Sequence, residues 1–106
     1  MVGVMFRRKS ADDSDGPTCV RLLLDRTQPV AERDAAAESL MYFPHPTAVV
    51  ALFAIASHAT EDDSLRVQAA ISLGVVWDTL GTDETLLACL PPHLQAEVRA
   101  SKQPAA

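Results

Sequence analysis

Aromatic residues are scarce in this 106-residue chain, where Trp, Tyr and Phe together make up 5% of the sequence. Hydrophobic residues nevertheless account for 48% of it, so the core has to be built from aliphatic side chains and alanine. That apolar fraction argues against an intrinsically disordered chain, which could not bury enough surface to offset its conformational entropy. We expect a single folded domain.

Cysteines and long apolar runs are also rare. Cys19 and Cys89 are the only cysteines, and they form no CxxC pair and no metal-binding spacing. The longest uninterrupted apolar run, residues 48–56, is far shorter than the roughly 20 residues that span a bilayer. The first residues place apolar before basic side chains, the reverse of a secretory signal. We therefore expect a cytoplasmic protein with reduced thiols and no membrane partner.

Positive charge is in short supply. Nine Lys and Arg face 14 Asp and Glu, which gives a formal net charge of −5. The one basic cluster, residues 7–9, is followed at once by the acidic stretch 12–15. Binding to nucleic-acid phosphates requires a basic surface, so we expect no nucleic-acid partner. The excess of Arg over Lys, together with abundant alanine, is typical of a bacterial protein.

Catalytic motifs are absent from the sequence: it contains no HExxH, P-loop, GxGxxG or GxSxG. His58 with Glu61 and Asp62 comes nearest to a ligand cluster, but helix capping explains those carboxylates more simply. We expect no catalytic residues, no cofactor and no metal site, and hence a protein that is not an enzyme.

Prolines, glycines and capping residues divide the chain into helix-sized pieces. We expect a flexible arm over residues 1–15, a helical domain over 16–100 and a frayed tail over 101–106. In an alternative arrangement of the arm, Val4, Met5 and Phe6 fold back over an exposed end of the core. The expected helices of the domain cover residues 17–26, 29–43, a segment from 46 that includes 48–56, a segment from about 62 to 80, 82–90 and 93–100.

An internal repeat is the most informative feature. Residues 27–43, TQPVAERDAAAESLMYF, align without a gap on residues 60–76, TEDDSLRVQAAISLGVV, at an offset of 33. Arg33 then matches Arg66, and the alanine pair at 36–37 matches the pair at 69–70. A fainter third copy follows at an offset of 37. Paired alanines at matching positions predict close approach of successive helices.

The stretch DDSLRVQAAISLG, residues 62–74, resembles the second helix of a HEAT repeat, in particular the short bacterial and bilin-lyase-like HEAT repeats. It has the acidic turn, the apolar–Arg pair, the Ala-Ala pair and the Leu-Gly pair of that family. The first copy departs from the pattern at Glu32 and Met41, which suits a terminal, solvent-facing repeat or else weakens the assignment. The resemblance implies an all-α fold, a short αα-solenoid of about two and a half helical hairpins in a right-handed superhelical stack. An ordinary helical bundle is the alternative.

The repeat also places individual side chains. Cys19, Leu52 and Cys89 occupy equivalent core positions, so we expect both cysteines to be buried, about 20 Å apart and too distant for a disulfide. Arg66 lies at a helix start, where its charge opposes the helix dipole, and we expect it to pair with Asp62 or Asp63. Trp77 is expected in the core.

One face of the expected fourth helix is a candidate interaction surface. Its core stripe comprises Leu65, Ala69, Leu73, Val76 and Leu80. A different face of this helix, together with the matching face of the second helix, combines charged and apolar groups that would be exposed to solvent. In the alternative, the last helix covers Ile71 and Val75. The candidate protein-binding residues are Arg33, Asp34, Glu38, Tyr42, Val67, Ile71, Val75 and Asp78.

The sequence therefore favours a non-catalytic protein-protein interaction module, an adaptor or an inhibitor of the immunity type, whose acidic surface suits a basic protein. Two alternatives stand beside it. One is an accessory subunit of a lyase-like enzyme that binds a small molecule or chromophore. The other is a self-assembling structural protein that forms a homodimer through an exposed end of the solenoid.

Overall fold

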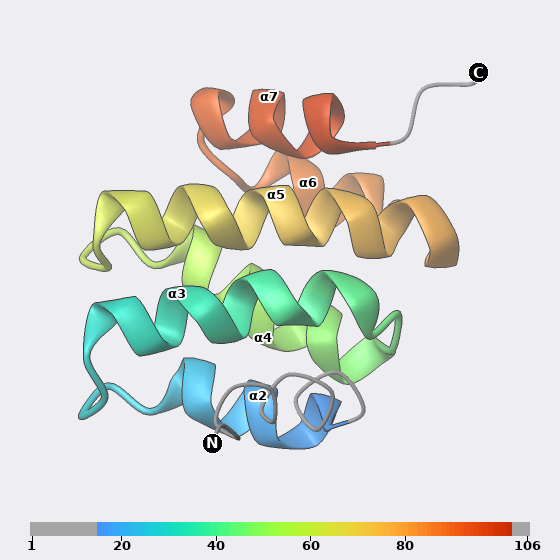
Figure 1. Cartoon of the computed structure of the whole chain (residues 1–106). Helices are drawn as coiled ribbons and strands as arrows, with labels where there is room; N and C mark the ends of the chain where they lie inside the picture. Colours follow the sequence, from blue (N-terminus) through green and yellow to red (C-terminus); the bar gives the residue numbers. More distant parts are fainter. Residues whose placement is uncertain (1–14, 103–106) are drawn as a thin grey trace.

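Six α-helices and one 3-10 turn make up residues 15–102, the part of the chain that the computed structural model describes (Figure 1). Residues 15–102 contain no β-strand, so the predicted all-α class is confirmed. The predicted arm, apart from Asp15, and most of the predicted tail lie outside the described residues. The elements are α2 (Gly16–Leu24), α3 (Val30–Ser39), η2 (Leu40–Tyr42), α4 (Pro46–Ser57), α5 (Asp63–Leu80), α6 (Glu84–Ala88) and α7 (Pro92–Ser101).

Local chemistry explains where the helices begin. The side chains of Asp15, Asp62 and Asp83 accept hydrogen bonds from backbone N–H groups in the first turns of α2, α5 and α6, which satisfies donors that have no partner inside the helix. Asp83, the N-cap of α6, bonds in this way to the N–H groups of Thr85 and Leu86. Helix α5 ends at Gly81, whose φ of 102° favours glycine.

The helices form two consecutive hairpins and a final shorter unit. We call α2–α3 the first helix pair and α4–α5 the second helix pair. Helices α3, α5 and α7 lie side by side in one layer, with α4 and α6 behind them (Figure 1). Helix α5 is central because it packs against α3, α4 and α7.

The core is aliphatic and rich in alanine, as the composition predicted. Four of the five residues in the predicted stripe of α5 are buried, and so is Trp77. Leu80 is the exception at 44% exposure, because the last turn of α5 extends beyond α3 and α7 (Figure 1). The fully buried large side chains are those of Leu23, Leu40, Leu52, Leu65, Leu73, Leu87, Leu94, Val76 and Val98.

The prediction for the cysteines is half right. Cys19 is buried, but Cys89 is exposed, and no disulfide joins them. Helix α6 has five residues whereas α4 has 12, so the 37-residue offset does not place Cys89 inside a helix. It caps the C-terminal end of α6 instead, with its Sγ 3.4 Å from the carbonyl oxygen of Thr85.

The same side-chain bond ties each helix pair together. Arg33 Nε donates to the carbonyl oxygen of Leu23 at 2.9 Å, and Arg66 Nε donates to that of Ala56 at 3.0 Å. Both arginines are the fourth residue of their helix, and both acceptors lie in the last turn of the preceding helix. Gln95, the fourth residue of α7, donates at 2.8 Å to the carbonyl oxygen of Leu90, which lies in the loop between α6 and α7. Each arginine bond satisfies a carbonyl that has no partner within its own helix, and it fixes how one helix turns back on the next.

The two arginines differ in what their outer nitrogens contact. The Arg33 guanidinium binds both carboxylate oxygens of Glu61, at 3.2 and 2.7 Å, and Arg26 lies 3.4 Å from the same carboxylate. The hydrogen bonds from Arg33 are the main cause that holds the pKa of Glu61 below its ordinary value. The positive charges of Arg33 and Arg26 lower it further. Ionised Glu61 therefore stabilises the fold above about pH 4.3, and this stabilisation is lost as the pH falls through its lowered pKa.

The predicted pairing of Arg66 with Asp62 or Asp63 is wrong. Within residues 15–102 no ion pair involves Arg66, because its Nε bonds to Ala56 while the Asp62 carboxylate caps α5. Of the two arginines, only Arg33 is held by a carboxylate within residues 15–102.

Replacing Gly74 with alanine should destabilise the protein. Replacing a glycine inside a helix with alanine usually stabilises a protein, by as much as about 1 kcal/mol. Here the new Cβ would lie 2.4 Å from the backbone oxygen of Val98 in α7, so α7 must shift, at a cost of about 1–3 kcal/mol. Chemical denaturation followed by far-ultraviolet circular dichroism measures the change, and a gain in stability would contradict this packing.

Replacing Arg33 with methionine should cost more stability than the same change at Arg66. Arg33→Met leaves Glu61 buried with only the exposed Arg26 beside it, which we expect to cost about 3–5 kcal/mol. Arg66→Met removes one side-chain hydrogen bond, worth about 1 kcal/mol. Urea denaturation of both variants at neutral pH measures the difference, and equal losses would show that the carboxylate contributes nothing.

Candidate protein-binding face

Residues at equivalent positions of the α3–η2 segment and of α5 face the same side of the molecule. Asp34, Glu38 and Tyr42 match Val67, Ile71 and Val75 at the 33-residue offset. Because α3 and α5 run side by side in the same direction (Figure 1), these equivalent positions lie on the same side of the molecule. We call this surface the α3–α5 face; its residues are Asp34, Glu38, Tyr42, Val67, Ile71, Val75 and Asp78.

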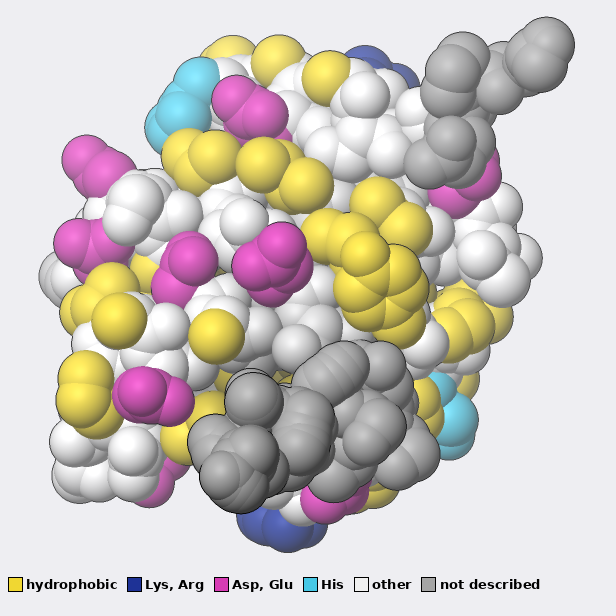
Figure 2. All heavy atoms as spheres, in the orientation of Figure 1, with side chains coloured by type: hydrophobic (Ala, Val, Ile, Leu, Met, Phe, Trp, Pro, Cys, Tyr) yellow, Lys and Arg dark blue, Asp and Glu magenta, His cyan; other side chains and the backbone are white. Residues whose placement is uncertain are grey.

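The α3–α5 face combines acidic and apolar groups within reach of solvent. Tyr42 is 69% exposed, and Glu38 and Asp78 are exposed as well. The other four residues of the face are half-buried. Figure 2 shows acidic side chains in the middle of this side of the molecule, with hydrophobic side chains gathered beside them over the C-terminal half of α5.

Arg33, the eighth candidate residue, does not belong to this face. Its side chain is 4% exposed and is held by Leu23 and Glu61. The sequence places Arg33 beside Asp34 but does not show that its guanidinium turns inward to close the first helix pair. The candidate surface therefore loses its only basic residue.

Helix α7 covers α5 only in part. Gly74 of α5 lies against the backbone of Val98 in α7. Ile71 and Val75, on either side of that contact, stay half-buried. The sequence left open whether the last helix covers Ile71 and Val75 or leaves them exposed. In the structure both side chains are partly covered and still reach solvent.

The acidic groups of the face are not neutralised. Burial raises the pKa of Asp34, and repulsion from Glu38 and Asp62 raises it further. No ion pair within residues 15–102 involves any of these three carboxylates. A cation placed over the face would relieve this repulsion, so the arrangement favours a positively charged ligand.

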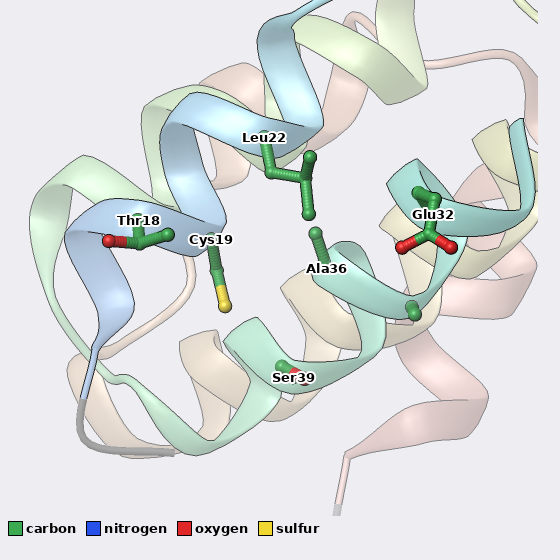
Figure 3. Close-up of a pocket in the computed structure, with 7 residues that line it drawn as sticks. Thr18, Cys19, Leu22, Glu32, Ala36 and Ser39 are labelled. Atoms are coloured by element: carbon green, nitrogen blue, oxygen red, sulfur yellow. The ribbon is translucent and has the colours of Figure 1, made fainter. Parts of the chain in front are cut away.

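A second feature, which the sequence did not reveal, is a groove between α2 and α3 with a volume of about 340 Å³. Helix α2 contributes Thr18, Cys19 and Leu22 to it. Figure 3 shows the Cys19 sulfur and the Leu22 side chain directed into the space between the two helices. The remaining lining residues, from α3, are Glu32, Ala35, Ala36 and Ser39.

The described residues show neither a metal centre nor a membrane-spanning helix. No group of three or more His, Cys, Asp or Glu side chains within residues 15–102 is placed to hold a metal ion. None of the helices in that range has the length and apolar character needed to cross a membrane. The three histidines lie at helix ends and turns; His45, for example, accepts a hydrogen bond from the backbone N–H of Thr47.

Comparisons of the chain with protein family models, with curated proteins and with solved structures find no match.

Replacing Asp34 with asparagine should stabilise the protein at neutral pH. The pKa of Asp34 is raised in the folded state, so deprotonation works against folding, and its destabilising effect develops as the pH rises above about 3.9, the ordinary pKa of an aspartate. Denaturant titrations should show a gain for Asp34→Asn at pH 7 that vanishes at pH 3. A loss of stability at pH 7 would mean that the carboxylate makes a favourable contact.

Proposed function

We propose that this protein is a short HEAT-like αα-solenoid that acts as a non-catalytic protein-protein interaction module through its α3–α5 face. The solenoid is supported by the recurrence of one bond. Arg33 and Arg66 each reach back from the fourth residue of a helix to a carbonyl ten residues earlier, in the last turn of the preceding helix. The same bond at the same position of two successive helix pairs is expected of stacked equivalent units.

The observation that carries the functional proposal is a cluster of carboxylates without ion-pair partners among residues 15–102, beside exposed apolar groups. The raised pKa of Asp34 reflects both its partial burial and its like-charged neighbours. Tyr42, the most exposed of the large hydrophobic residues in the described chain, lies at the end of the same layer, and exposed tyrosines commonly anchor protein interfaces.

The partner we propose is a protein that presents basic side chains next to an apolar patch. Its cations would pair with Asp34 and Glu38, and its apolar groups would cover Tyr42 and the half-buried valines and isoleucine of α5. The net charge of −5 would also speed the encounter with a basic partner. An adaptor, or an inhibitor that blocks a basic enzyme, fits this chemistry.

Reversing the charge of Glu38 should weaken partner binding, whereas the same reversal at Glu84 should not. Both side chains are exposed, but Glu84 lies on α6, away from the α3–α5 face. The partner is first captured from native lysate with the tagged chain, identified by mass spectrometry and purified. Calorimetric titration should then show affinity at least about tenfold lower for Glu38→Lys, and near wild-type affinity for Glu84→Lys.

Two results would overturn this assignment. Equal affinities of the two variants would remove the α3–α5 face from the interface. An acidic partner surface, seen as affinity that increases with salt concentration, would contradict the charge complementarity on which the proposal rests.

A further inference from the structure

The groove between α2 and α3 is exposed on the first helix pair, whereas the equivalent surface of the second helix pair is buried. At the 33-residue offset, the groove residues Cys19, Leu22 and Ala36 correspond to Leu52, Ile55 and Ala69. Those three counterparts are at most 3% exposed, and the helices that carry them pack against the first helix pair. The groove is therefore the side of the first pair on which a preceding pair would lie.

The groove keeps an apolar floor although no helix pair precedes it in the described chain. Cys19 and Ala36 are buried, and Leu22 is half-buried. Its rim is more polar than the equivalent surface: Thr18 stands where the second pair has Ala51, and Glu32 stands where it has Leu65. An apolar floor with a carboxylate at its rim fits a short segment that carries both apolar and basic residues.

We propose that residues 1–14 of this chain occupy the groove and cover the exposed side of the first helix pair. These residues directly precede Asp15, the N-cap of α2, and the groove begins one turn later at Thr18. Residues 1–6, MVGVMF, are apolar throughout, and residues 7–9, RRK, are basic. The apolar block suits the floor, and the basic block suits the exposed carboxylate of Glu32.

The length of the segment allows this placement. The nine residues from Phe6 to Asp15 reach about 30 Å when extended, whereas α2, with nine residues, is only about 14 Å long. Residues 1–14 are too few to form another helix pair, so they would cover the floor as one short segment. The inference is independent of the α3–α5 face, which lies on other surfaces of α3 and on α5.

Thiol reactivity of Cys19 tests the proposal in the full-length chain. The exposed Cys89 is first replaced, as Cys89→Ser, so that an aromatic disulfide reagent reports Cys19 alone. The double change Met5→Asp and Phe6→Asp should release the segment and speed the reaction at least about tenfold, because the thiol no longer needs local opening to react. The matched control, Ala11→Asp, adds a charge outside the apolar block and should leave the rate unchanged.

Two outcomes of this experiment would overturn the proposal. Equal rates in the double variant and in the parent chain would show that residues 5 and 6 do not cover the groove. A rate in the parent that increases on dilution would assign the cover to a second copy of the chain. Far-ultraviolet circular dichroism of each variant checks that the helices remain folded.

Cross-linking provides a second, positive test. The change Phe6→Cys in the Cys89→Ser background should allow mild oxidation to join residue 6 to Cys19 within one chain, since a disulfide requires Cα atoms within about 7 Å. Mass spectrometry would detect a monomer that has lost two hydrogen atoms. A product formed only as a covalent dimer would exclude the intrachain arrangement, and no cross-link at all would place residue 6 away from the groove.

Discussion

The hydrogen bond from the arginine side chain to the end of the preceding helix is the contact on which the rest of the architecture depends. The last carbonyls of α2 and α4 have no acceptor role within their own helices, and Arg33 and Arg66 donate to them from the first turn of the next helix. Because the donor is the Nε atom, the outer nitrogens remain available for other contacts. At the first junction they bind Glu61, which joins the first helix pair to the loop that begins α5.

Small side chains determine how closely the helices approach once these junctions are set. The buried alanines at 36, 37, 69 and 70 leave room for neighbouring backbones, and Gly74 lets α7 approach α5. With the alanine side of α3 and α5 turned inward, the residues at 34, 38, 67 and 71 are left near the surface. The mixed acidic and apolar character of the α3–α5 face follows from this division of each helix.

Much of the fold could be predicted because it depends on local chemistry and on the repeat. Prolines and aspartates mark where helices start, and the 33-residue offset pairs Arg33 with Arg66 correctly. The wrong predictions, for Cys89 and for the partner of Arg66, concern features that the sequence alignment does not contain. The position of Cys89 depends on the short length of α6, which an offset does not reveal, and the partner of Arg66 is a carbonyl ten residues earlier in the chain. The α2–α3 groove could not be predicted, since it depends on how the side chains of α2 and α3 pack together and not on any motif in the sequence.

The contrast between the two junctions has a consequence for how the molecule opens. Glu61 makes the junction between α2 and α3 ionic, whereas at the junction between α4 and α5 no ion pair within residues 15–102 involves Arg66. Acid therefore weakens the first junction more than the second, because the Glu61 carboxylate must be ionised to bind Arg33. Local unfolding should then become uneven in acid, and amide hydrogens of α2 and α3 should exchange with solvent before those at the centre of α5 and in α7. The two helix pairs share one backbone contact but differ in charge, so acid should open the molecule from the side of the first pair.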